Sequence, residues 1–480
     1  MNLADVVRIN ARNRPQNAAI RHAGQTLDYR DCWRRIEGIA AALHATGIRR
    51  GNRVGLALKD HPLHLLAHYA VARIGAVIVP VDHRWTATEK TAAAKAFDLR
   101  LALTDGECVN GVDCLTLTHS VADTDNGSLP AMPQDPDLPL LISLSSGTTG
   151  RPKGAIVTHG NLYERFVSQW TAIGYDASDC FALVTPLFFG AGRSFGMCML
   201  AAGGSVLLAP PPMKPPQLVA ALSDAAVTAT FLPPTLLRRL LPLAKGASSP
   251  LLAHIRYLLV SGEPLYAGEA ADCRQRICPN LVGYYASSEG GGVSVLSTPD
   301  FETHADTVGT PTFRTEVEIV DADNRPLPAG QVGRLRYRGP GVATRFVDSN
   351  GKQTQSEDGW FYPGDLAERL PSGHLALRGR DGDVIIRGGV NIYPNEIEAA
   401  LQQHPDVREC AVVAKNDGER GQRVVACVVT AADASELQRF CESRLAPYKI
   451  PGEFLLFDDL PKAASGKIDK KALAARVADD

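Results

Sequence analysis

Residues 143–154 read SLSSGTTGRPKG, and they begin inside the apolar run 140–144, which has the length and composition of a buried strand. Backbone N–H groups and hydroxyls in such a loop can surround phosphate oxygens, while Lys153 adds a mobile positive charge. A Walker A loop needs a glycine followed by Lys-Ser or Lys-Thr, whereas Pro152 and then Lys153-Gly154 stand here. The segment therefore predicts a phosphate-binding loop of another kind rather than a plain surface turn.

The chain before this loop alternates between helical and extended patterns. Apolar residues recur at helical spacing over 33–43, and a short apolar run follows at 54–58. A second helix is expected to begin at Pro62, because proline suits the first helical turn, and the next strand is expected at 76–80. Strand, helix and strand at this spacing predict right-handed crossovers and a parallel sheet. The fold class is therefore α/β.

The chain after position 380 has a different texture. It shows a strand at 384–386, a helix opened by Pro394, strands at 411–414 and 424–429, and an amphipathic helix over 435–445. This pattern predicts a compact α+β module of about 100 residues. We therefore expect a large N-terminal region of mixed and parallel sheets with packed helices, residues 1–381, and a small α+β C-terminal domain, residues 382–480.

The overall composition limits the classes of partner. The 480 residues carry 50 Lys+Arg against 52 Asp+Glu, a formal net charge of -2, which argues against broad electrostatic binding of nucleic acid or of an anionic membrane. No signal peptide or transmembrane segment is visible. The ten cysteines form no CxxC pair, and the closest pairs, Cys108 with Cys114 and Cys273 with Cys278, lack metal-ligand spacing. We expect a cytoplasmic protein with reduced thiols that acts on small molecules.

Six segments, in this order, resemble the motifs of the adenylate-forming superfamily, which includes acyl-CoA synthetases, peptide-synthetase adenylation domains and firefly luciferase. The first is the phosphate loop, and the resemblance runs from about Thr26 to the end of the chain. Two segments depart from the family pattern: Ala286 and Ser288 replace Gly and Thr, and Pro363 replaces Thr. The matching segments are SSGTTGRPKG at 145–154, YASSE at 285–289, GWFYPGD at 359–365, the long junction motif at 379–398, LAPYKIP at 445–451 and PKAASGKI at 461–468.

The resemblance implies roles for particular residues. Lys467 would bridge the substrate carboxylate and the α-phosphate of ATP, and Glu289 would act in catalysis by holding Mg²⁺. Asp365 would accept hydrogen bonds from the ribose hydroxyls with help from Arg380, and Tyr285 would stack on adenine. The remaining nucleotide-binding residues implied by the motifs are Ser145, Ser146, Gly147, Thr148, Thr149, Gly150, Lys153, Gly262, Glu263, Pro264 and Ser288.

The resemblance also implies a mobile C-terminal domain that rotates between adenylation and thioester formation. Gly382 falls at the hinge position, where glycine absorbs a backbone change at little steric cost. Gly388 and Gly389 match the paired glycines that line a pantetheine tunnel in members that use coenzyme A. Gly382 could also lie in an ordinary turn, and this alternative is compatible with a hinge.

The acid pocket is where the resemblance is weakest. Phe189 stands where the family usually has histidine, and no Asp follows that could pair with the ammonium of an amino acid. We expect an aryl or medium-chain acyl group in a pocket formed by Phe189, Gly190, Phe231 and Tyr284. Arg193 could meet a second substrate carboxylate, but a helix-surface arginine is the favoured interpretation.

Two further patterns compete with this interpretation. Residues 192–196 match G-x-S-x-G, so Ser194 could be the nucleophile of a serine hydrolase, with His254, His304, His374 or His404 as its partner. The stripe of His61, His64 and His68 on one helical face could bind a metal, but a surface stripe is favoured.

The sequence therefore predicts an ATP-dependent, AMP-forming ligase that joins a small-molecule carboxylic acid to coenzyme A, in fatty acid or aromatic acid metabolism. It would use ATP, Mg²⁺ and coenzyme A. The leading alternative delivers the acyl group to a carrier-protein thiol, and the serine hydrolase remains a remote one. Neither the exact acid nor the oligomeric state follows from the sequence, and a homodimer stays open.

Overall fold

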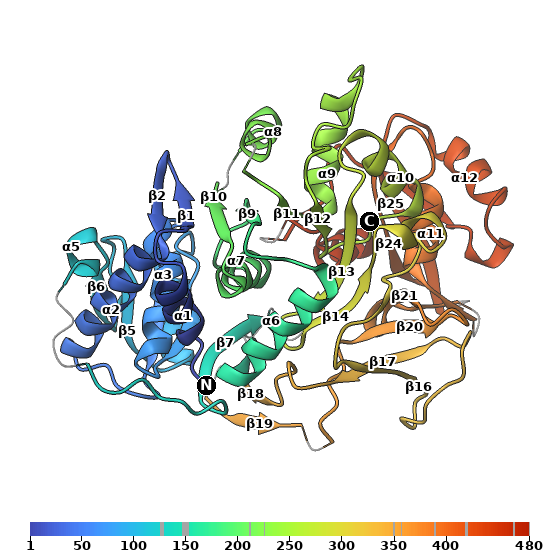
Figure 1. Cartoon of the computed structure of the whole chain (residues 1–480). Helices are drawn as coiled ribbons and strands as arrows, with labels where there is room; N and C mark the ends of the chain where they lie inside the picture. Colours follow the sequence, from blue (N-terminus) through green and yellow to red (C-terminus); the bar gives the residue numbers. More distant parts are fainter. Residues whose placement is uncertain are drawn as a thin grey trace.

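The computed structural model describes residues 1–124, 129–145, 153–210, 213–224, 226–348, 351–356, 358–387, 390–417, 421–463 and 466–479. Four sheets organise these residues, two large ones in the N-terminal region and two smaller ones toward the C-terminus (Figure 1).

One large sheet has eight strands in the order β19-β18-β8-β7-β4-β3-β5-β6. Strands β7, β4, β3, β5 and β6 pair in parallel, and the other pairings are antiparallel. Its strands are β3 (Arg53–Ala57), β4 (Val77–Pro80), β5 (Leu99–Thr104), β6 (Asp113–Thr116), β7 (Pro139–Ser145), β8 (Lys153–Thr158), β18 (Arg345–Val347) and β19 (Gln353–Gln355).

The other large sheet has nine strands in the order β15-β14-β13-β12-β11-β9-β10-β1-β2. Its six central strands, from β13 to β1, are parallel, and an antiparallel strand or pair closes each edge. Its strands are β1 (Ala18–His22), β2 (Gln25–Asp28), β9 (Cys180–Leu183), β10 (Ser205–Leu208), β11 (Ala229–Leu232), β12 (Tyr257–Val260), β13 (Leu281–Ser287), β14 (Gly291–Leu296) and β15 (Thr310–Pro311).

Helices connect and cover these two sheets. One cluster of buried side chains includes residues of both sheets and of α2, α3, α6 and α7, so the two sheets share one core. The helices of this region are α1 (Asp5–Asn13), α2 (Tyr29–Ala45), α3 (Pro62–Arg73), α4 (Ala87–Ala96), α5 (His119–Ala122), α6 (His159–Ile173), α7 (Gly190–Ala202), α8 (Pro215–Leu222), α9 (Pro234–Leu240), α10 (Ala267–Arg276) and the 3₁₀ turns η1 (Leu241–Ala244) and η2 (Pro299–Glu302).

A four-stranded antiparallel sheet, β16-β17-β20-β21, precedes the C-terminal module (Figure 1). Its strands are β16 (Glu316–Val320), β17 (Gly333–Arg338), β20 (Asp365–Arg369) and β21 (Leu375–Arg380). The C-terminal module has a five-stranded sheet. Buried side chains of α11 and α12 form one hydrophobic cluster with it, and those of α13 form a second cluster. Its elements are η3 (Asp381–Asp383), β22 (Ile385–Arg387), β23 (Val390–Ile392), α11 (Pro394–Leu401), β24 (Val407–Asp417), β25 (Gly421–Thr430), α12 (Ala434–Glu442), η4 (Pro447–Lys449), β26 (Glu453–Leu456) and α13 (Lys470–Asp479).

The predicted α/β class, with large N-terminal sheets and a smaller α+β C-terminal part, is confirmed. The helix expected from Pro62 is α3, and the flanking strands β3 and β4 pair in parallel, with Arg53 opposite Val77. The helix expected over 435–445 is shorter, since α12 ends at Glu442. Within the described part of the chain, no helix is both long and apolar enough to cross a membrane.

The predicted surface stripe of histidines is wrong for His64 and His68 of α3, while His61, just before the helix, is partly exposed. His64 and His68 are buried, and their rings stack with centroids 5.2 Å apart. Each Nδ1 atom has a backbone partner one turn earlier, the carbonyl of Lys59 for His64 and that of His64 for His68. Burial, with Arg193 nearby, lowers the pKa of His68 to about 3. The cause is the apolar surroundings of α3, which is buried on nearly every side.

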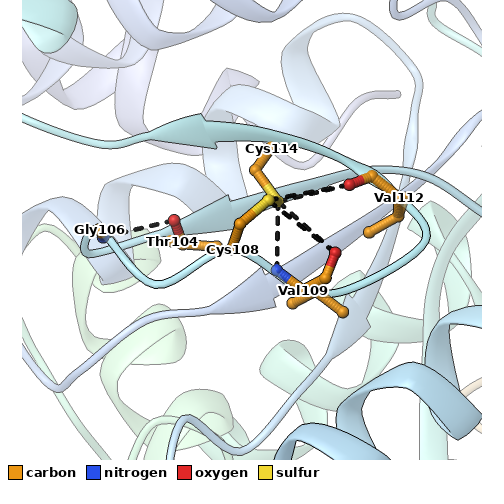
Figure 2. Close-up of a disulfide and its surroundings, with 6 residues drawn as sticks. All are labelled: Thr104, Gly106, Cys108, Val109, Val112 and Cys114. Atoms are coloured by element: carbon orange, nitrogen blue, oxygen red, sulfur yellow. Dashed lines mark hydrogen bonds between the residues drawn. A yellow bond between two sulfur atoms is a disulfide. The ribbon is translucent and has the colours of Figure 1, made fainter.

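The expectation of reduced thiols is wrong for one pair, because Cys108 and Cys114 form a disulfide (Figure 2). The bond closes a small ring between β5 and β6, where both sulfur atoms lie near the backbone carbonyls of Val109 and Val112. The other eight cysteines are free and buried. The sequence analysis weighed this pair only as metal ligands, although turns of this size bring two Cα atoms within bonding reach.

Thiol labelling of the chain, purified without reductant, is expected to distinguish two groups of cysteine. Alkylation in denaturant should modify eight cysteines, and all ten after reduction, because only Cys108 and Cys114 are bonded. Mild reduction of the folded protein should expose these two alone, since Cys108 is exposed while the eight free thiols are buried. Intact-mass spectrometry counts the adducts, and ten adducts without reduction would contradict the disulfide.

Candidate functional site

The predicted site residues lie where the nine-stranded sheet, the four-stranded sheet and the C-terminal module meet. Tyr285 is near the carboxyl end of β13, and Gly262 follows the carboxyl end of the neighbouring parallel strand β12. Asp365 and Arg380 come from the four-stranded sheet, and Lys467 comes from the C-terminal module. Ligands of open α/β sheets bind beyond the carboxyl ends of parallel strands, which is where these side chains gather.

Tyr285, Asp365 and Arg380 form one connected group. Asp365 and Arg380 lie directly opposite each other in the β20–β21 pair, and Arg380 Nη1 is 3.1 Å from Asp365 Oδ1. The Tyr285 hydroxyl donates a hydrogen bond to Asp365 Oδ2. Burial raises the pKa of the Asp365 carboxyl, against the opposing effect of the Arg380 charge. The group therefore holds a buried carboxylate with an arginine half exposed to solvent beside it.

Lys467 of the C-terminal module lies near this group of Tyr285, Asp365 and Arg380. Its Cε atom would lie 3.8 Å from a Cβ atom at Gly262, which has a φ of +97°, so a side chain there would be strained as well as close. Burial lowers the pKa of Lys467, and the nearby Arg380 lowers it further, while Glu263 and Asp365 act in the other direction. The Lys467 ammonium group therefore lies near the charged side chains of Glu263, Asp365 and Arg380, on a residue that is itself exposed.

The segment 262–264 is fixed from α9. The Thr235 hydroxyl donates to both carboxylate oxygens of Glu263, at 2.9 and 2.7 Å. Arg238 donates to the Pro264 carbonyl at 3.2 Å and pairs with Glu269 at 2.6 Å. The Glu263 carboxylate is therefore held in place near Lys467 rather than free to swing into the site.

Glu289 lies beyond β13, and Arg165, which sequence reasoning missed, supports its backbone. Arg165 of α6 donates to the carbonyl groups of Ser288, Glu289 and Gly341. Burial lowers the pKa of this arginine to about 10. A signal was present in the sequence, since Arg165 falls on the buried stripe of α6 with Leu162, where an apolar residue is expected.

The structure describes the two residues that flank the predicted phosphate loop, Ser145 and Lys153. Ser145 ends β7 and Lys153 begins β8, and the two residues are paired across this antiparallel hairpin. Ser146, Gly147, Thr148, Thr149 and Gly150 lie outside the described residues, as do Gly388 and Gly389. Gly382 is described, within the short turn η3 directly after β21.

The predicted acid pocket is partly assembled. Phe231 and Tyr284 are buried, and both pack against Phe195 of α7, with ring centroids 5.7 and 5.5 Å away. Phe189, at the start of α7 before Gly190, has its ring against Phe188 instead. Phe195 was not predicted as a pocket residue. It follows Ser194 in the segment that was considered only as a G-x-S-x-G motif.

Arg193 is not a helix-surface arginine, so the favoured interpretation of it was wrong. Its side chain is buried, and Nη1 donates to the carbonyl groups of Phe188 at 3.1 Å and Leu187 at 3.4 Å. Burial lowers its pKa to about 10. The first turn of α7 lies in the shared core, and Arg193 folds back to bind the loop that leads into its own helix.

Ser194 lies within helix α7, where its hydroxyl accepts a hydrogen bond from the Gln169 amide at 2.9 Å. A nucleophile elbow places its serine on a sharp turn between a strand and a helix. The helical position of Ser194 does not fit that arrangement, so the hydrolase alternative loses its structural basis.

Comparison with known proteins assigns the whole chain. Residues 7–347 match the family of AMP-binding enzymes, and residues 396–467 match the AMP-binding enzyme C-terminal domain. The chain is 32% identical to a feruloyl-CoA synthase of Amycolatopsis sp over 97% of both chains. It is 28% identical to an indoleacetate–CoA ligase of Aromatoleum aromaticum, over 100% of this chain and 98% of the relative.

A solved structure agrees with this assignment. The o-succinylbenzoate CoA synthetase of Bacillus subtilis, in complex with its acyl-adenylate intermediate, superimposes with a TM-score of 0.88 at 25% identity. The match covers 98% of this chain and 97% of that one. ATP-bound MatB of Rhodopseudomonas palustris shares the fold, with a TM-score of 0.89 at 23% identity over 100% and 99% of the two chains. The resemblance found in the sequence is thus confirmed, and the chain belongs to the AMP-binding enzyme family of adenylate-forming acid–CoA ligases.

Proposed function

We propose that this enzyme activates an aryl carboxylic acid with ATP and transfers the acyl group from the adenylate to the thiol of coenzyme A. The observation that carries the proposal is that Lys467 lies near the ion pair of Arg380 with the buried Asp365 carboxylate. Two different parts of the chain supply these groups, so the site is complete only when the C-terminal module is docked.

Joining a carboxylate to the α-phosphate of ATP expels pyrophosphate and makes a mixed anhydride that a thiol can open. The displacement concentrates negative charge on the phosphate, so positioned cations supply most of the rate enhancement. In this proposal Lys467 stabilises that charge and brings the two anions together.

Asp365 binds the ribose in this proposal. Its two oxygens already meet the Tyr285 hydroxyl and the Arg380 guanidinium. A carboxylate has about four acceptor positions, so both oxygens can still accept from ribose hydroxyls. Tyr285 offers its ring to the base and its hydroxyl to Asp365, which sets the ring orientation.

The residues present fit a magnesium ion that accompanies ATP. No hydrogen bond or ion pair among the described residues engages the Glu289 carboxylate, and the backbone that carries it is held by Arg165. A carboxylate oxygen is a ligand that Mg²⁺ prefers, and the ion neutralises phosphate charge when bound. We propose Glu289 as this ligand, with the phosphate loop from Ser145 to Lys153 around the phosphates.

An aryl acid suits the pocket. The cluster of Phe195, Phe231 and Tyr284 offers flat apolar surfaces. The buried Tyr284 hydroxyl and the Gln169 side-chain amide lie within reach of each other here, and neither Tyr284 Oη nor Gln169 Oε1 has another hydrogen-bond partner within the described residues. A ring hydroxyl can both donate and accept, so a hydroxylated aryl acid would satisfy these atoms. The related feruloyl-CoA synthase acts on an acid of this class.

Coenzyme A is the proposed acceptor, with Gly388 and Gly389 lining its tunnel, and the relatives named above use it. A carrier-protein thiol is the alternative acceptor, and a homodimer stays a proposal without a surface assigned to it. We place the enzyme in the cytoplasm because ATP and coenzyme A are supplied there. A reducing compartment would open the exposed disulfide at Cys108.

The proposed domains are residues 1–381 and 382–480, with Gly382 as the hinge. Asp381 is still tied to the large region, since its N–H donates to the Gly364 carbonyl at 2.9 Å. A Cβ at Gly382 would meet nothing within 4 Å. The residue thus lies in open space directly after this hydrogen bond.

Pyrophosphate release across hydroxycinnamates, cinnamates, benzoates and fatty acids, with and without coenzyme A, tests the function. Turnover that depends on coenzyme A and is at least about 10-fold faster with a ring-hydroxylated acid than with its unsubstituted parent is expected, because one matched hydrogen bond contributes about 1.4 kcal/mol. Acceptance of the carrier-protein thiol alone would contradict the proposed acceptor, and preference for fatty acids would contradict the aryl substrate.

Lys467→Ala is expected to lower the rate of acyl-adenylate formation at least about 100-fold, because the variant loses the cation that would stabilise the charge on the phosphate. Thioester formation from supplied acyl-adenylate should remain largely intact. Lys462→Ala is the matched control, since Lys462 bridges to Ile468 in the same hairpin but its ammonium group pairs with Glu409. Equal loss of both half-reactions in Lys467→Ala would contradict the assigned role.

Gly382→Pro should preserve adenylation and slow thioester formation, because proline fixes φ and opposes the domain rotation. Gly382→Ala is the control, since a methyl group meets nothing at this position. The two half-reactions are measured separately by pyrophosphate exchange and by thioester release. Unchanged overall turnover in Gly382→Pro would remove the hinge from this position.

A further inference from the structure

Three metal-ligating side chains come together away from the nucleotide site. Asp300 lies in the turn η2, and His304 follows it in the connection between β14 and β15. His374 comes from the turn between β20 and β21, in the four-stranded sheet. Backbone hydrogen bonds join the two segments, from Val308 to the Leu375 carbonyl and from Leu375 to the Gly309 carbonyl, each 2.8 Å long.

The three side chains are close enough to share one ion. One ligand atom from each of Asp300, His304 and His374 lies within 4.8 Å of the other two. The imidazole rings of His304 and His374 are stacked, with centroids 3.9 Å apart and planes 3° apart. Two atoms bound to one Zn²⁺ at about 2.1 Å lie at most about 4.2 Å apart, so a small rotation of the side chains closes the set.

His374 has a buried nitrogen without a partner. The residue is 8% exposed, and its Nε2 makes no hydrogen bond within the described residues. The nearest carboxylate oxygen, Oδ2 of Asp300, is 3.8 Å away, which is longer than the 3.2 Å limit of an ordinary hydrogen bond. A buried nitrogen left unpaired in this way costs free energy unless another group binds it.

Hydroxyl groups orient all three side chains toward one another. Nδ1 of His304 is 2.8 Å from the Thr303 hydroxyl, and Nδ1 of His374 is 3.0 Å from the Ser372 hydroxyl. The Ser297 hydroxyl donates to Asp300 Oδ2 at 2.7 Å. Histidines that bind a metal through one ring nitrogen hydrogen-bond through the other, and the partner fixes the ring.

We propose that Asp300, His304 and His374 bind one Zn²⁺ ion through a carboxylate oxygen and the two Nε2 atoms, with water in the fourth position. Two imidazoles and one carboxylate suit Zn²⁺ better than Mg²⁺, which prefers oxygen ligands alone. The ion joins the β14–β15 connection to the β20–β21 turn. Strand β21 separates it from Arg380 by five residue steps, about 17 Å. The site is therefore structural and independent of the acid that the enzyme activates.

The test uses the full-length chain without an affinity tag, stripped with a chelator and titrated with Zn²⁺ against a chromophoric competitor. One equivalent is expected to bind, with a rise in melting temperature, and excess Mg²⁺ should not displace it. Asp300→Asn and His374→Asn should each weaken binding more than 100-fold, and Ser372→Ala about 10-fold to 100-fold, as loss of a supporting hydrogen bond does. His254→Asn is the control, since His254 lies outside the cluster and bonds to the Leu222 carbonyl.

Three outcomes would overturn the proposal: no tight equivalent of Zn²⁺, binding unchanged in both ligand variants, or equal loss in the His254→Asn control. The stripped variants need only match the melting temperature of the stripped parent to show that they fold. The adenylation rate of the loaded parent should equal that of the stripped parent within about 2-fold, so failure here leaves the proposed function untouched.

Discussion

The ion pair between Asp365 and Arg380 is the constraint on which the rest of the site depends. Antiparallel pairing of β20 with β21 sets the two residues directly opposite each other, so the hairpin register alone places a carboxylate beside a guanidinium. Tyr285 reaches the same carboxylate from β13, and the C-terminal module follows directly after Asp381, the neighbour of Arg380. One hairpin thereby joins the parallel sheet, these charged side chains and the C-terminal module.

Burial acts on the two central charges in opposite directions. It raises the pKa of Asp365 and lowers that of Lys467, because each group loses water that favours its charged form. Each charge lies near an opposite charge that offsets part of this cost, Arg380 for the carboxylate and Glu263 for the ammonium group. The C-terminal module supplies Lys467 to this group of charges, so the group is assembled from both parts of the chain.

Sequence reasoning selected Lys467, Asp365 and Arg380, which the structure brings near one another, because they stand in ordered motifs with short spacings. It missed residues whose contacts depend on the fold. Arg165 supports Glu289 by binding backbone carbonyl groups, and carbonyls leave no trace in a sequence. His64 and Arg193 were taken for surface residues because helical spacing defines a face without saying what packs against it. The disulfide was not predicted, because the spacing of two cysteines in the sequence does not show whether their sulfur atoms approach each other.

The sequence by itself determined the α/β class, the order of the main elements and the identity of the nucleotide-binding motifs, because hydrophobic periodicity and turn residues act over a few positions. Only the tertiary structure decided which strands are neighbours, which polar side chains are buried and which distant residues meet. Asp300 and His374 are 74 positions apart in the chain, yet Asp300 Oδ2 lies 3.8 Å from His374 Nε2. Pairings of this kind depend on how whole sheets pack, and packing is a property of the assembled core rather than of any local segment.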